Sequence, residues 1–187
     1  MGQAKTLTTE ELERLLDHVA KRRLAIRNRV LLLMSFWSGM RVGEIASLKL
    51  RDVVDSKGVV RGEIRLDHTQ TKGKHARTVF MPTKLREELQ RYVDLRLDQH
   101  KDAALFLTAG GKPFSANVLT QLYFWLYRRA GIEASSHSGR RTFITSLATQ
   151  GVGVRVLAGL AGHRSIAVTQ RYIDVNDDMK RRAVELI

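Results

Sequence analysis

The stretch "GHRSIAVTQRYID" covers residues 162–174, near the end of a 187-residue chain. Tyr172 follows His163 by nine residues in this stretch, and basic side chains stand between the two. Ser165 is a good helix N-cap, and the apolar residues after it predict a short helix over 165–173 that carries the tyrosine. A tyrosine on such a helix is commonly a core or surface residue, so the role of Tyr172 depends on the rest of the chain.

A second histidine lies upstream, in "SSHSGRRTFITSLATQG" at residues 135–151. His137 and Arg140 are three residues apart at the start of a helix predicted over 138–150. This spacing places an imidazole and a guanidinium side by side at a helix N-terminus, which itself favours anions. The structural alternative is a serine cap, at Ser135 or Ser136, beside a solvated histidine.

Arg41 follows the apolar stretch "LLLMSFWSGM", where Gly39 ends a helix predicted over 22–38. Glu44 comes three residues later, in a short helix predicted within "RVGEIASLKL". Both residues have a structural alternative, because Arg41 could pair with the carbonyl end of the preceding helix and Glu44 could be its ion-pair partner.

The remaining pattern predicts one mostly helical α+β domain over residues 1–187. Thr8 and Glu11 form the capping box of the first helix. Between residues 53 and 81 the apolar residues alternate, which predicts a small three-stranded antiparallel sheet whose last turn, "TKGKHAR", carries Lys72. Further helices are predicted at about 83–99, 115–130, 138–150, 153–160, 165–173 and 177–186.

The charge of the chain predicts a polyanionic partner. Lys and Arg number 32 against 19 Asp and Glu, giving a net charge of +13, and positive charge gains affinity from phosphates by releasing counterions. The longest apolar run, residues 30–34, is far too short to span a bilayer. The absence of cysteine fits a reducing cytoplasm, and no two histidines have the i, i+4 spacing of a metal pair on one helical face.

Together these residues resemble the catalytic domain of the tyrosine recombinases, the phage integrase family. The family pattern is G-x-R-x-x-E, a lysine at a β-hairpin tip, H-x-x-R opening a helix, and G-H followed by Y. The matching residues are Gly39, Arg41, Glu44, Lys72, His137, Arg140, Gly162, His163 and Tyr172. Lys74 is an alternative to Lys72, and three positions depart from the pattern: Gly139, Arg141 and Asp174 stand where relatives often carry leucine, histidine and histidine.

The resemblance implies attack by Tyr172 on a DNA phosphodiester, leaving a 3′-phosphotyrosyl bond and a free 5′-hydroxyl. Because only about one free phenol in a thousand is ionised at pH 7, the nucleophile needs positive charge and a proton acceptor nearby. Phosphate binding is implied for Arg41, Arg140 and His163, proton acceptance for His137, and protonation of the leaving group for Lys72. Glu44 would orient Arg41, and no metal, ATP or other cofactor is expected.

The resemblance also implies partners and a location. These are double-stranded DNA, a homo-tetramer on paired DNA sites, and accessory DNA-bending proteins, with no membrane, in a cytoplasmic, nucleoid-associated protein of bacterial or phage origin. The N-terminal core-binding domain of the family is expected to be absent. Residues 177–187 would form a helix that either caps its own core or docks on a neighbouring protomer.

Integration, excision and inversion are all compatible with this chemistry, and two other functions stay open. One is strand cleavage and rejoining without exchange, as in a type IB topoisomerase or a telomere resolvase. The other is a DNA-binding module without catalysis, in which arginines of the helices grip phosphate or simply form solvated faces: Arg22, Arg23, Arg27, Arg29, Arg128, Arg129, Arg181 and Arg182.

Overall fold

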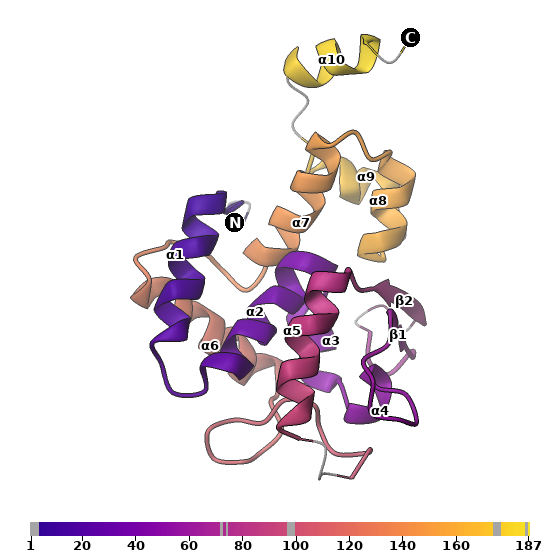
Figure 1. Ribbon diagram of the computed structural model, residues 1–187. Coiled ribbons are helices and arrows are strands. Elements are labelled where there is room, and N and C mark those ends of the chain that lie inside the picture. Colours follow the sequence, from indigo (N-terminus) through magenta and orange to yellow (C-terminus); the bar gives the residue numbers. More distant parts are fainter. Residues whose placement is uncertain (1–3, 72, 74, 97–99, 174–176, 186) are drawn as a thin grey trace.

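The computed structural model describes residues 4–71, 73, 75–96, 100–173, 177–185 and 187. Helices predominate, with one small sheet at the side of the molecule (Figure 1). The elements in chain order are α1 (Thr9–Ala20), α2 (Ala25–Ser38), α3 (Val42–Ser47), α4 (Leu50–Val53), β1 (Glu63–Leu66), β2 (Arg77–Phe80), α5 (Thr83–Asp94), α6 (Ala116–Arg129), α7 (Ser138–Thr149), α8 (Val154–Ala161), α9 (Ile166–Gln170) and α10 (Asp177–Val184).

Helix α2 lies at the centre of the fold, against α1, α5 and α7 (Figure 1). Its consecutive residues Val30–Met34 are all fully buried, as expected for a helix that is apolar on every side. Gly39 ends the helix in the left-handed conformation, with φ of 66°, which confirms the predicted stop. Because α2 is buried and ends at Gly39, the backbone of the residues that follow, which include Arg41, has a fixed position.

Gly139 allows α7 to approach α2 closely. A Cβ atom at this position would lie 2.5 Å from Ser35 Oγ and 2.9 Å from Ser35 Cβ, too close for any side chain. The departure from the family pattern at Gly139 thus has a packing reason. The close approach of α7 to α2 also fixes the start of α7, where Arg140 lies.

The sheet has two strands in the described part of the chain, so the prediction of three was wrong. β1 and β2 pair antiparallel, with Ile64 opposite Val79 and Leu66 opposite Arg77. The segment predicted as the third strand makes a single isolated bridge between Val54 and Val60 instead. Asp55 ends any extended pairing there, because its carboxylate accepts from the backbone N–H groups of residues 57 and 59 and closes a turn.

Most predicted helices are present, with shifted ends. The capping box at Thr8 and Glu11 is confirmed. The helix predicted within residues 41–50 divides into α3 and α4, while the one predicted at 165–173 ends at Gln170 as α9. Among the described residues, no helix is long and apolar enough to cross a bilayer.

Candidate active site

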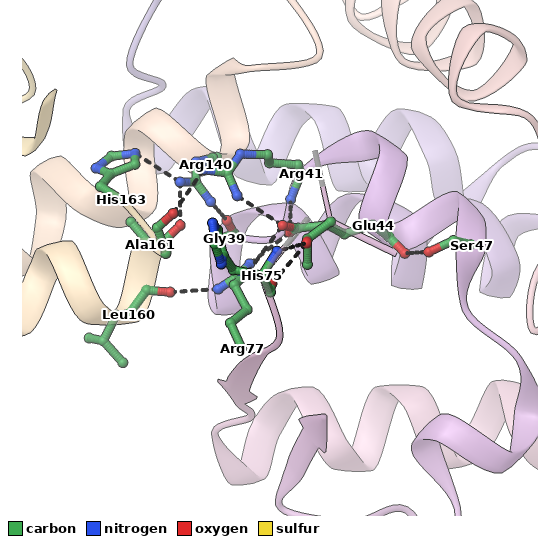
Figure 2. A network of polar contacts seen from close by, with 12 residues as sticks. Gly39, Arg41, Glu44, Ser47, His75, Arg77, Arg140, Leu160, Ala161 and His163 are labelled. Carbon is green, nitrogen blue, oxygen red and sulfur yellow. Dashed lines mark hydrogen bonds and ion pairs between the residues drawn. The ribbon is translucent and has the colours of Figure 1, made fainter. Parts of the chain in front are cut away.

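A buried carboxylate lies at the centre of the site. Glu44, on α3, has a side chain that is 1% exposed and two arginine partners (Figure 2). Its Oε1 accepts from Arg41 Nη1 at 2.8 Å, and its Oε2 accepts from Arg77 Nη2 at 2.7 Å. Burial alone would raise the pKa of Glu44, but the hydrogen bonds and charge of the two arginines lower it below its ordinary value. Glu44 is therefore an anion that orients both guanidiniums.

Arg77 is a site residue that the sequence analysis missed. Its side chain is 9% exposed, and its Nη1 also donates to the carbonyl of Leu160, at the end of α8, at 2.9 Å. The strand pattern contained a signal that Arg77 faces inward. Arg77 lies two residues before the buried Val79, so both side chains are on the same face of β2. An arginine on the inward face of a strand needs a buried partner, and here the partner is Glu44.

Arg140 lies beside this pair and brings α7 into the site (Figure 2). Its guanidinium donates to the carbonyls of Gly39, at 2.6 Å, and Ala161. Burial first, and then the charges of Arg41 and Arg77, lower the pKa of Arg140 to about 9, so it remains a cation at pH 7. Two guanidiniums thus pair with a single carboxylate and a third lies nearby, so the site carries an excess of positive charge that suits an anion.

His163 is neutral and its tautomer follows from its partners. Its Nε2 lies 2.9 Å from Arg140 Nη2, and its Nδ1 lies 2.9 Å from Thr169 Oγ1. Because a guanidinium has no acceptor, Nε2 must accept, which leaves the ring proton on Nδ1 to be donated to the threonine. Burial, and after it the charge of Arg140 and its neighbours, lowers the pKa of His163 to about 4, in agreement with a neutral ring.

Tyr172 lies in the turn that follows α9, not in the helix predicted to carry it. Its ring stacks on His163, with centroids 5.6 Å apart and an interplanar angle of 24°. All four tyrosines of the sequence are described, and the other three, Tyr92, Tyr123 and Tyr127, are at most 5% exposed. Tyr172 is partly exposed, so it is the tyrosine whose hydroxyl can reach a molecule outside the protein.

Two grooves meet at this tyrosine and histidine. One, of about 940 Å³, is lined by Tyr172, by the exposed His137 at the start of α7, and by basic residues. The other, of about 690 Å³, is lined by Arg41, His163 and the hairpin loop at Gly73. Val168 lines both grooves. The structure therefore brings six of the predicted site residues to one region: Arg41, Glu44, His137, Arg140, His163 and Tyr172.

Lys72, the seventh predicted site residue, lies outside the described residues, as does Lys74. Their described neighbour Gly73 faces the second groove, and its carbonyl accepts from Arg164 Nη2 at 3.3 Å.

One arginine considered for a phosphate-gripping or solvated helix face has neither role. Arg27 is 7% exposed, and its Nη1 donates to the carbonyl of Leu107 at 2.6 Å, so it is a structural residue of the interior.

The sequence is similar to those of known tyrosine recombinases. Tyrosine recombinase XerA of Pyrococcus furiosus is 31% identical over 186 residues, which cover 97% of this chain and 61% of the relative. The XerA of Thermococcus kodakarensis is 32% identical over 187 residues, covering 97% and 62%. The chain thus spans about three fifths of the length of these relatives.

Solved structures share the fold. The crystal structure of XerA recombinase superposes with a TM-score of 0.80 and 28% identity, covering all of this chain and 66% of that one. The Tn1549 transposon integrase in complex with transposon right end DNA gives a TM-score of 0.76 at 19% identity, covering 100% and 67%. The sequence also matches the model of the phage integrase family over residues 5–179. With its fold and nearly its whole length accounted for in this way, the chain belongs to the phage integrase family.

Proposed function

We propose that this chain is the catalytic part of a site-specific DNA recombinase. Tyr172 Oη attacks a backbone phosphorus, the bond from phosphorus to the 5′ oxygen breaks, and a 3′-phosphotyrosyl bond and a 5′-hydroxyl result. Attack by a 5′-hydroxyl on the phosphotyrosyl bond reverses the step and releases the tyrosine. No external energy source is needed, because one ester bond replaces another at each step.

The observation that carries this proposal is the excess of positive charge beside the tyrosine that reaches solvent. Arg41 and Arg77 share one carboxylate, Arg140 lies near them without a carboxylate partner of its own, and His163 is neutral. A buried cation cluster is stabilised by an anion, and the anion must lie where the Tyr172 ring, stacked on His163, can reach it. A phosphodiester meets both requirements.

Each residue of the site has a proposed role in the reaction. Arg41, whose side chain is 27% exposed in the second groove, and Arg140 stabilise the charge that develops on the non-bridging oxygens of phosphorus. Loss of either would slow cleavage on the order of a hundredfold. His137 shares a groove with Tyr172 and accepts or relays the phenolic proton, and Lys72 donates a proton to the departing 5′ oxygen.

The proposed partner is double-stranded DNA, and the proposed assembly is a homo-tetramer on two DNA sites. The net charge of +13 supports the first proposal, as does the Tn1549 integrase, which was solved in complex with DNA. Two duplexes have four strands to cut and rejoin, so full exchange requires four copies of a chain that has one nucleophilic tyrosine each. The helix α10 is the proposed contact between neighbouring copies.

The test is covalent capture on DNA. The protein is incubated with a pool of nicked duplexes of randomised sequence. In these duplexes the short fragment that carries the new 5′-hydroxyl diffuses away after cleavage, so the phosphotyrosyl bond cannot be resealed and the adduct accumulates. The wild-type protein is expected to form an SDS-resistant adduct, and sequencing the attached DNA gives the target. Tyr172→Phe is expected to bind DNA without forming the adduct, because the variant lacks the nucleophilic oxygen.

Tyr92→Phe is the matched control, because it removes a buried hydroxyl that donates to the carbonyl of Leu105. This variant should form the adduct as the wild type does. An adduct that persists in Tyr172→Phe would refute the role proposed for this tyrosine.

A further inference from the structure

Arg141 contacts the ring of Tyr172. The Arg141 guanidinium carbon lies 5.4 Å from the centroid of the Tyr172 ring, within the range of a cation–π interaction. Arg141 is 9% exposed and follows Arg140 on α7. It is also one of the positions at which this sequence departs from the family pattern, since relatives often carry histidine there.

The N-terminal segment orients this guanidinium. Arg141 Nε donates to Thr6 Oγ1 at 3.2 Å. The next residue is fixed as well, because the Leu7 N–H donates to Thr142 Oγ1 at 3.0 Å and the Leu7 side chain is buried. Two consecutive residues before α1 are thus hydrogen-bonded to two consecutive residues of α7. These bonds fix the N-terminal segment beside α7, and the Thr6 hydroxyl there orients the Arg141 guanidinium.

The backbone of Tyr172 is held while its ring still needs a partner to fix its direction. The Tyr172 N–H donates to the carbonyl of Thr169 at 2.9 Å, and its own carbonyl accepts from Thr145 Oγ1 at 3.1 Å. Neither bond fixes the torsions of the side chain. Stacking on His163 and the cation–π contact with Arg141 are the aromatic and cation–π interactions of the Tyr172 ring within the described residues. Removing the cation should therefore lower the ratio of Tyr172 rings in this orientation to rings in other orientations by about three- to thirtyfold.

We propose that Arg141 is a positioning residue for Tyr172, and that the Thr6 hydroxyl sets the direction of its guanidinium. The N-terminal segment is thereby coupled to the nucleophile through Thr6, Arg141 and the tyrosine ring. This inference rests on the proposed function, in which Tyr172 is the nucleophile. The alternative is that Arg141 grips a DNA phosphate, since it lines the same groove as Tyr172.

Three measurements separate these roles. DNA affinity and its salt dependence are measured by fluorescence anisotropy, and the rate of adduct formation is measured in a single turnover at saturating DNA. The third measurement is the ¹⁹F resonance of 3-fluorotyrosine at position 172 in the DNA-free protein. The protein has four tyrosines, and Tyr172→Phe identifies the resonance of this one.

Arg141→Met keeps the length of the side chain and removes its charge. It is expected to slow adduct formation about tenfold and to shift the ¹⁹F resonance, with DNA affinity unchanged within about twofold. Arg141→Lys should recover part of the rate, because it restores a cation without the fork that Thr6 directs. A phosphate contact would instead weaken binding, reduce the salt slope by about one, and leave the rate at saturating DNA unchanged.

Thr6→Val tests the same link without altering Arg141 and guards against misfolding of the arginine variants. It removes the acceptor and keeps the shape of the side chain, so adduct formation should slow about threefold with a shifted ¹⁹F resonance. Thr6→Ser retains the hydroxyl and is the control. Wild-type rates and an unmoved resonance in both Thr6→Val and Arg141→Met would overturn the inference while Tyr172→Phe still abolished the adduct. An adduct in Tyr172→Phe would instead refute the proposed function, and the ¹⁹F resonance would still decide whether Arg141 positions the ring.

Discussion

His163 shows how a single side chain reports the state of the site. Its Nε2 accepts from Arg140, and its Nδ1–H donates to Thr169 Oγ1. The ring cannot take a second proton without losing the contact with Arg140 and adding a charge beside three guanidiniums. A phosphate in the site would supply the missing negative charge. The structure therefore holds His163 in its neutral form.

This arrangement predicts a pH dependence of stability. The pKa of His163 is about 4 in the folded protein and about 6.5 in the unfolded chain, so the unfolded state binds the proton first as pH falls. The free energy of unfolding therefore decreases as pH falls from about 6.5 towards 4, by on the order of 1 kcal/mol, because solvent screens the partly exposed ring. Urea unfolding of the wild type and of His163→Gln across this range measures the difference.

The glutamine variant is a suitable reference because its amide oxygen can still accept from Arg140 and does not titrate. Carboxylates such as Glu44 titrate in both proteins and cancel in the comparison. Parallel stability curves for the two proteins between pH 4 and 7 would contradict the lowered pKa of this partly buried histidine.

At the scale of elements, Arg77 joins three parts of the chain that are distant in sequence. It extends from β2 to Glu44 on α3 and to the carbonyl end of α8. Gly162, which ends α8 with φ of 62°, leaves room for it, since a Cβ there would lie 2.6 Å from Arg77 Cδ. The sheet therefore fixes the positions of two helices of the candidate site, α3 and α8, although it lies at the side of the molecule (Figure 1).

Removal of this link should destabilise the protein. Arg77→Met leaves Glu44 buried with one arginine partner instead of two, so the free energy of unfolding should fall by about 2 to 4 kcal/mol. Arg65→Met is the matched control from the same sheet, because Arg65 pairs with Glu63 while its side chain is 85% exposed. The control should change stability by less than about 0.5 kcal/mol. Equal losses in the two variants by chemical denaturation would show that the buried pair does not hold these elements together.

The same elements show what the sequence could and could not predict. The start of α1 and the end of α2 were predictable because the capping box at Thr8 and the stop at Gly39 depend only on neighbouring residues. The third strand was predicted wrongly because Val59 alternates as a strand residue would, while Asp55 closes a turn there. The position of Arg77 on the inward face of a strand indicates burial, but its partner Glu44 is 33 residues away and could not be identified from the local pattern.

On the scale of the whole molecule, the site is assembled from segments that are distant in sequence. Arg41 directly precedes α3, Arg140 lies in the first turn of α7, and His163 follows the end of α8. The packing of α2 against α3 and α7, and of α7 against α8, brings these positions together. The family pattern predicted this gathering, whereas periodicity alone predicted only the helices. The hydrogen bonds that tune the site, such as the one that fixes the tautomer of His163, depend on packing between elements and could not be predicted from either source.

The C-terminal helix α10 projects away from the rest of the chain (Figure 1). Its side chains from Lys180 to Glu185 are exposed, and Val184 is 64% exposed. Two roles were predicted for this segment, capping of its own core and docking on a neighbouring protomer. The exposure favours docking, because an apolar side chain that caps a core is buried within its own chain.

Deletion of residues 177–187 separates the two roles. Docking predicts a melting temperature close to that of the full chain, unchanged binding to a single DNA site, and loss of cooperative assembly on DNA that carries two sites. Val184→Asp tests the same contact in the full chain, because an exposed charge costs little stability in the free protein and is costly in an apolar interface. Sedimentation on one-site and two-site DNA measures assembly, and calorimetry measures stability. A melting temperature several degrees lower, with assembly intact, would assign α10 to its own core, because only a buried helix contributes that much to folding.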